Sequence, residues 1–166
     1  ITSMVKRGDR LYIIGDMMFG SREEAIDLLS KIHCDKFFIN GNHDKAFNQL
    51  DNYFQWKGDI KMATFQKELY PFLNQDFEVC MCHYPMLSWP RKPHGSMMLH
   101  GHTHNNAPFE NEGNDLRLNV GIDNPICNFK LFSLEQVYDE YKKKLKGLTP
   151  RQYIEKISKE DKYFIR

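Results

Sequence analysis

The feature that most constrains this chain is a series of short apolar stretches that each end in glycine or in a polar side chain. Four such stretches are Arg10–Ile14 before Gly15-Asp16, Phe37–Ile39 before Asn40 and Gly41-Asn42-His43-Asp44, Phe77–Cys82 before His83, and Ser96–Leu99 before His100 and Gly101-His102-Thr103-His104. Short apolar runs bounded by turn-forming residues are typical of buried strands. Because α/β proteins bind ligands at the carboxyl ends of strands, we expect the polar side chains to meet at one edge.

The side chains at these strand ends are oxygen and nitrogen donors. Asp16 offers a carboxylate, Asn42 an amide oxygen, and three histidines offer imidazole nitrogens, namely His83, His102 and His104. Such a donor set suits manganese, iron, zinc or nickel, whereas a structural zinc site favours cysteine thiolates. None of the four cysteines lies at these positions. We interpret the cysteines as reduced, apolar residues of a cytosolic protein.

Length and composition indicate one globular domain, since 166 residues with 41% hydrophobic content suffice for a sizeable core. No apolar run approaches the length of a membrane span, so we expect a cytoplasmic protein without a membrane partner. Residues 141–166 carry nine Lys and Arg but three Asp and Glu. We interpret this basic segment as a solvated helix face, with contact to an anionic partner such as nucleic acid as the alternative.

Two capping boxes predict where helices begin. Ser21 is followed three residues later by Glu24, and Ser133 by Gln136, a spacing that satisfies the free N–H groups of a first helical turn. Gly147 is expected to end the second helix, and Thr149-Pro150 to begin a third. The first helix would join two parallel strands by a right-handed crossover, which brings Asp16 and Asn42 to the same edge. Residues 45–75 have no clear period, and helix and irregular loop both stay open.

Taken together, these motifs resemble the second to fifth motifs of the calcineurin-like metallophosphoesterases. The matching residues are Gly15-Asp16, Gly41–Asp44, His83 and Gly101–His104, in the family's order and spacing, and the likeness spans residues 4–135. His83-Tyr84-Pro85, Leu99–His102 and Asn119–Asp123 are also similar to the small single-domain phosphoesterases of bacteria and phages.

The resemblance implies a fold. It is an α/β fold, an αββα sandwich of two mixed β-sheets flanked by helices. The phosphoesterase domain would span residues 1–135. Residues 136–166 would form a helical extension that either packs on the domain or trails from it.

The resemblance also implies a centre with two divalent metal ions, for which manganese is our first expectation. Asp16 would bridge both ions. Asn42, His83 and His102 would complete one metal site, and His104 would belong to the other. One hydroxide held by two ions would hydrolyse the phosphoester, so the protein would be a phosphatase or a phosphodiesterase.

Two further residues have implied catalytic roles. His43 matches the family's histidine beside the leaving group, and Asp44 matches the carboxylate that orients it. The expected substrate is a phosphoester small molecule or a nucleotide. For the nearby histidines, we interpret His100 as structural, while a substrate-facing role and plain surface exposure both stay open for His94.

The chain departs from the family at the first motif, because Asp-x-His occurs nowhere in the 166 residues. We expect that motif upstream of Ile1. The alternative is a protein that has lost half of a metal site and serves as a scaffold or binding module with this fold. The His43-Asp44 pair favours the enzyme, since a scaffold has no use for a leaving-group acid. A nuclease is the third hypothesis, suggested by the basic segment.

Overall fold

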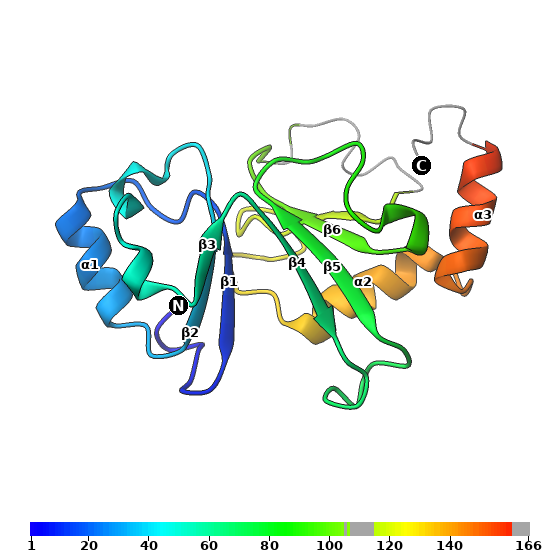
Figure 1. Ribbon diagram of the computed structural model, residues 1–166, viewed down its shortest axis with the longest axis horizontal. Coiled ribbons are helices and arrows are strands. Elements are labelled where there is room, and N and C mark those ends of the chain that lie inside the picture. The colour runs from blue at the N-terminus through cyan, green and yellow to red at the C-terminus, as the bar shows by residue number, and fades with distance from the viewer. Residues whose placement is uncertain (105, 107–114, 161–166) are drawn as a thin grey trace.

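The computed structural model describes residues 1–104, 106 and 115–160, and in these residues it forms two β-sheets and three α-helices (Figure 1). The strands are β1 (Arg10–Ile14), β2 (Asp35–Ile39), β3 (Trp56–Gly58), β4 (Ile60–Phe65), β5 (Phe77–Cys82), β6 (Met97–His100) and β7 (Arg117–Asn119). The α-helices are α1 (Arg22–Ser30), α2 (Leu134–Leu145) and α3 (Pro150–Glu160). Short 3₁₀ helices are η1 (Asp44–Phe47), η2 (Asp51–Tyr53) and η3 (Lys92–His94).

The first sheet contains β1, β2 and β3 in that order, and both strand pairs are parallel. The predicted capping box at Ser21 and Glu24 is present and begins α1, which connects β1 to β2. Ile14 and Ile39, the last residues of β1 and β2, are direct partners in the register. The residues that follow these strands therefore emerge at the same edge of the sheet, as the strand–helix–strand pattern predicts.

The second sheet has the order β4-β5-β6-β7 and is mixed, with an antiparallel β4–β5 pair and parallel pairs beyond it. The expectation of two mixed sheets is therefore right for this sheet and wrong for the first one, within the described residues. The reason lies in the connections. The chain returns through α1 before β2 and through η1 and η2 before β3, and such returns make neighbouring strands parallel.

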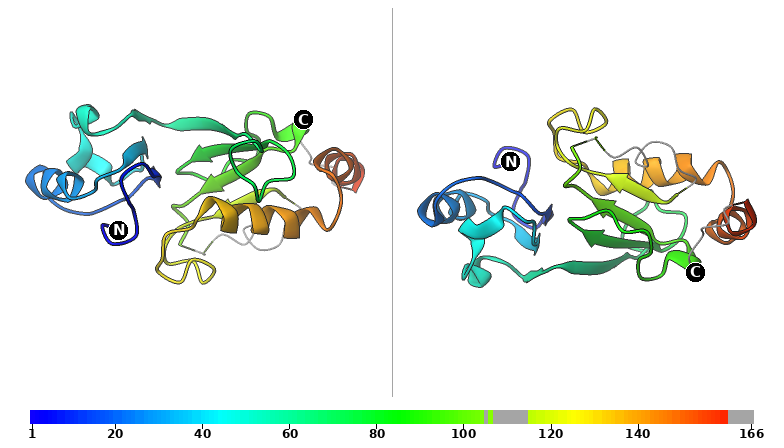
Figure 2. Two further views of the ribbon diagram at one scale, coloured as in Figure 1. Left: turned by 90° about the horizontal axis from the view of Figure 1, so that it is seen from below. Right: turned by 90° about the horizontal axis from the view of Figure 1, so that it is seen from above.

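Alternate residues of β1 serve two hydrophobic cores. Leu11 and Ile13 belong to a cluster with α1, whereas Tyr12 and Ile14 pack against the larger cluster around the second sheet. Tyr12 also contacts Phe65 of β4, with ring centroids 6.1 Å apart. The first sheet is thus covered on one side by α1 and on the other by the second sheet, and α1 and α3 lie at opposite ends of the molecule (Figure 2).

The helical segment after the strands packs on the second sheet. The capping box at Ser133 and Gln136 begins α2, as predicted. Tyr141 of α2 contacts Phe77 of β5 with ring centroids 4.8 Å apart, and its hydroxyl donates to the carbonyl of Gly95. Tyr153 of α3 belongs to the same core. Of the two arrangements left open for residues 136–166, the described part shows packing.

The segment 45–75 holds two strands that its sequence does not indicate. β3 is three residues long, and β4 is an edge strand whose residues Ile60–Thr64 are exposed or half-buried. An edge strand has only one neighbour and little burial, so its hydrophobic alternation is weak. Lys61 interrupts the alternation, because this charged residue is half-buried in β4 with its ammonium group over the rings of Phe37 and Trp56.

The cysteines are free thiols, and three of them are buried. Burial raises the pKa of the Cys80 thiol to about 11, which keeps it protonated at neutral pH. They behave as the apolar residues that we expect. None of the described helices has the length and hydrophobicity needed to cross a membrane.

Candidate metal centre

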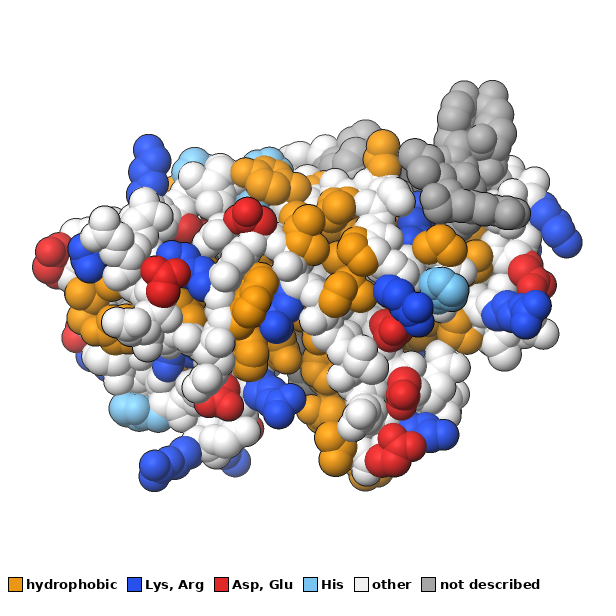
Figure 3. Space-filling model, in the orientation of Figure 1, with side chains coloured by type: hydrophobic (Ala, Val, Ile, Leu, Met, Phe, Trp, Pro, Cys, Tyr) orange, Lys and Arg blue, Asp and Glu red, His pale blue; other side chains and the backbone are white. Residues whose placement is uncertain are grey.

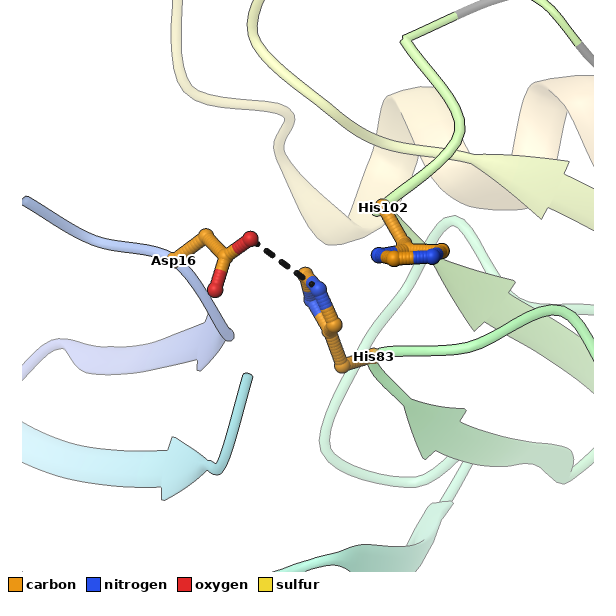
Figure 4. Close-up of side chains that lie close together, drawn as sticks. All are labelled: Asp16, His83 and His102. Atoms are coloured by element: carbon orange, nitrogen blue, oxygen red, sulfur yellow. Dashed lines mark ion pairs between the residues drawn. The ribbon is translucent and has the colours of Figure 1, made fainter. Parts of the chain in front are cut away.

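Four of the predicted ligands converge where the strand ends of the two sheets meet. Asp16 follows β1 and Asn42 follows β2 in the first sheet, while His83 follows β5 and His102 follows β6 in the second. Figure 4 shows Asp16, His83 and His102 approaching one another from these separate elements. Their candidate ligand atoms all lie within 4.8 Å of one another. The convergence of these three residues and Asn42 is thus present in the structure.

The spacing of the donor atoms suits a single ion. Nε2 of His83 lies 3.2 Å from Oδ2 of Asp16 and 3.1 Å from Oδ1 of Asn42, and Nδ1 of His102 lies 3.0 Å from the same Asn42 oxygen. With metal–ligand bonds of about 2.1 Å, adjacent corners of an octahedron lie about 3.0 Å apart and opposite corners about 4.2 Å apart. The three separations of 3.0–3.2 Å therefore match those between neighbouring ligands of one divalent ion.

A hydrogen bond to the backbone directs Nε2 of His83 toward the other candidate ligands. Nδ1 of His83 lies 3.0 Å from the carbonyl oxygen of Ile14, which can only accept, so the neutral ring carries its proton there. Nε2 of His83 lies beside the Asp16 carboxylate and the Asn42 amide oxygen, and in the neutral ring its lone pair is available to a cation. The donor set therefore fits a metal ion.

Backbone conformation helps to aim these ligands. Asp16 has φ of 50°, His102 of 70° and His104 of 47°, all in the left-handed region that residues other than glycine seldom adopt. Such conformations persist where the surrounding structure enforces them, and they concentrate at functional sites.

Glycine at position 41 allows the two strand ends to approach closely. A Cβ on Gly41 would lie 2.3 Å from Oδ1 of Asp16 and 2.5 Å from its backbone nitrogen. The site therefore requires glycine here for space.

Asp44 fastens the two strand ends together. Oδ2 accepts hydrogen bonds from the backbone N–H of Asp16 at 2.8 Å and of Gly41 at 2.6 Å, and Oδ1 accepts from that of Met17 at 3.1 Å. The side chain of Asp44 is buried at the start of η1. No hydrogen bond joins Asp44 to the imidazole of His43 among the described residues, so the orienting role stays a prediction.

Replacing Asp44 by alanine should lower the free energy of unfolding by about 2–4 kcal/mol, because three partly buried N–H groups would lose their acceptor. In thermal unfolding this corresponds to a fall in Tm of roughly 5–15 °C for a chain of this size. The matched control is Asp27→Ala, since Asp27 is exposed and pairs with Lys31 at the surface, a type of pair worth about 1 kcal/mol or less. Equal effects of the two substitutions would contradict the fastening role.

The structure places His43 and His104 outside the converging group. His43 is exposed, its backbone N–H donates to Oδ1 of Asp16 at 2.9 Å, and its ring lies against that of Phe19. His104 is also exposed, and its Nδ1 lies 2.5 Å from Oδ2 of Asp123. The structure therefore brings four of the five predicted ligands together and leaves His104 paired with a carboxylate.

The remaining histidines near these motifs lie apart from the centre. His100 is buried, its Nδ1 lies 3.1 Å from the carbonyl oxygen of Gly101, and burial lowers its pKa. This agrees with a structural role. His94 is exposed in η3 and lines a shallow surface cavity with residues of α3 such as Arg151.

Sequence reasoning assigned no role to three neighbours of the centre. Asp123 pairs with His104, and the rings of Phe19 and Tyr84 contact histidines of the site. Asp123 had a weak signal, since it follows the strand that ends at Asn119. Tyr84 lies in the segment His83-Tyr84-Pro85 that resembles the phosphoesterases, and Phe19 had no signal, because a lone aromatic residue in a loop is usually part of the core.

Comparisons with known proteins agree with the α/β class and name no function. No protein-family profile matches the chain. Gene 66 protein of Mycobacterium phage L5 is 25% identical over 158 residues, covering 82% of this chain and 75% of the phage protein. The crystal structure of a protein of unknown function from Aquifex aeolicus superimposes with a TM-score of 0.57 and 18% identity, covering 84% of this chain and 80% of that one. This chain is therefore a mixed α/β protein with a candidate metal centre.

Proposed function

We propose that this protein is a metal-dependent phosphoester hydrolase of the calcineurin-like type. The observation that carries the proposal is the meeting of Asp16, Asn42, His83 and His102, with Nε2 of His83 beside the carboxylate of Asp16 and the amide oxygen of Asn42. A bound divalent ion supplies a Lewis acid for phosphoryl oxygens and lowers the pKa of a coordinated water. Manganese stays our first expectation, and the oxygen and nitrogen donors also suit iron, zinc or nickel.

Different residues of this chain would bind that ion and orient its ligands. Asp16, Asn42, His83 and His102 would hold it, and Ile14 would fix the ring of His83 through its carbonyl oxygen. The dinuclear centre implied by the resemblance is part of the proposal, with Asp16 and His104 as the residues described here that would serve the second ion.

His43 would hold the proton that the leaving oxygen receives. Its backbone N–H is bonded to Asp16, which keeps it beside the centre, while its exposed imidazole is free of the ligand cluster and open to a substrate. A histidine can give up a proton near neutral pH, which suits the release of an alkoxide.

Metal-dependent hydrolysis of simple esters tests the proposal. The protein should release p-nitrophenol from bis(p-nitrophenyl) phosphate or p-nitrophenyl phosphate with Mn²⁺ and not with excess EDTA. His83→Ala should abolish the release, whereas His33→Ala should keep it, because His33 is exposed and precedes β2 at the opposite end of that strand from Asn42. Release that ignores EDTA, or survives the loss of His83, would contradict a metal-dependent reaction at this centre.

A further inference from the structure

Two exposed aromatic side chains border the candidate metal centre. Phe19 is 76% exposed and Tyr84 is 45% exposed. Phe19 lies in the connection between β1 and α1, and Tyr84 directly follows His83 after β5. Figure 3 shows hydrophobic side chains beside histidine side chains along the upper edge of the molecule.

Each of these rings contacts a histidine of the site. The ring centroid of Phe19 lies 5.0 Å from that of His43, and the centroid of Tyr84 lies 4.7 Å from that of His102. The ring planes are inclined by 51° for Phe19 and His43 and by 63° for Tyr84 and His102, so these contacts are tilted or edge-on, and a large part of each aromatic ring faces solvent. Phe19 thus contacts the residue proposed to protonate the leaving oxygen, His43, and Tyr84 contacts a proposed metal ligand, His102.

Core packing does not explain this exposure. Phe38 and Phe47 are fully buried, whereas Phe19 belongs to neither hydrophobic cluster. An aromatic side chain that stays mostly in water contributes little hydrophobic stabilisation, since that term scales with the area removed from water.

Further exposed apolar side chains lie on the His104 side of the site. Ile122 is 57% exposed and precedes Asp123, the partner of His104. Phe129 is 75% exposed, and its backbone N–H donates to the carbonyl of Ile122. Exposed apolar groups that gather beside polar ligands are typical of a binding site, where a few polar groups fix a largely apolar molecule.

We propose that Phe19 and Tyr84 form a subsite for a planar aromatic group carried by the phosphoester, as a nucleobase is carried by a nucleotide. The inference rests on the proposed function, because the phosphoryl group at the metal centre would set where the rest of the substrate lies. Exposed aromatic faces bind such groups by stacking, which tolerates different bases.

The test compares three probes on the Mn²⁺-loaded chain by calorimetric titration. They are inorganic phosphate, ribose 5-phosphate and adenosine 5′-monophosphate, which differ by the sugar and then by the base. Because loss of one stacking contact weakens binding about fivefold or more, adenosine monophosphate should bind at least about fivefold more tightly than ribose 5-phosphate.

Substitutions assign that preference to the two rings. Phe19→Leu and Tyr84→Leu keep apolar volume but remove the ring, so each should lower the ratio of the two affinities. Tyr84→Phe keeps the ring and should keep most of the preference. Leu69→Ala is the control, because Leu69 is 69% exposed in the β4–β5 connection and takes no part in the site.

Two failures can be told apart. If Mn²⁺ and inorganic phosphate bind but the two larger probes bind equally, or if neither leucine variant lowers the preference, the aromatic subsite is refuted while the metal centre stands. If neither Mn²⁺ nor phosphate binds, the proposed function fails, and the subsite falls with it.

Discussion

Replacing Gly15 by alanine should destabilise the protein by at least about 3 kcal/mol and weaken metal binding by about tenfold or more. Gly15 has φ of 75°, where an L side chain is strained. A Cβ there would also lie 2.3 Å from Nδ1 of His83 and 2.8 Å from Cα of Gly41. The His83 ring would have to leave the Ile14 carbonyl, which fixes its tautomer and direction.

The control for this substitution is Gly147→Ala. Gly147 has a similar φ of 80°, but a Cβ there would meet nothing within 4 Å. It should therefore cost only the backbone strain, roughly 1–2 kcal/mol, and leave metal affinity as it was. Denaturant unfolding measures the first effect and metal titration the second. If both variants lose the same stability and Gly15→Ala binds metal normally, the close packing of Gly15 on His83 has no functional importance.

Replacing His43 by alanine should reduce turnover by about 10²–10⁴-fold, the usual range for losing a general acid. Metal content should change little, for two reasons in the structure. The imidazole of His43 is not among the converging ligand atoms, and the bond to Asp16 comes from the backbone N–H, which alanine retains.

Elemental analysis of the purified variant separates catalysis from binding. His33→Ala serves as the control for general effects of removing an exposed histidine. Loss of metal from His43→Ala would show that His43 is itself a ligand, and unchanged turnover would remove it from the reaction.

The parts of the fold that could be predicted from the sequence are those with a local chemical cause. The boxes at Ser21 and Ser133 begin helices because their side chains satisfy N–H groups three residues on. The apolar run before His83 forms a central strand whose residues are nearly all buried, and the run before Asp16 forms an edge strand whose alternate residues contribute to both hydrophobic cores. Parallel strands joined by one helix then bring Asp16 and Asn42 to one edge.

Features that depend on tertiary contacts have no local signal in the sequence. β3 and β4 were missed because a three-residue strand and an exposed edge strand lack a hydrophobic period. The fastening role of Asp44 was missed because its carboxylate accepts hydrogen bonds from backbone N–H groups. Such groups occur at every residue except proline, so no side-chain pattern indicates which of them Asp44 will bind. The pairing of His104 with Asp123 spans residues far apart in the chain, so no local pattern indicates it.

Metal titration of the protein and of one ligand variant tests the central claim most directly. We expect an ion to bind at Asp16, Asn42, His83 and His102, and thermal stability to rise with metal concentration, by about 2.7 kcal/mol at 100 times the Kd. His83→Ala should abolish that tight binding and the stabilisation, while His33→Ala should keep both. Failure of Mn²⁺, Fe²⁺, Zn²⁺ and Ni²⁺ to bind, or binding that survives the loss of His83, would contradict the account.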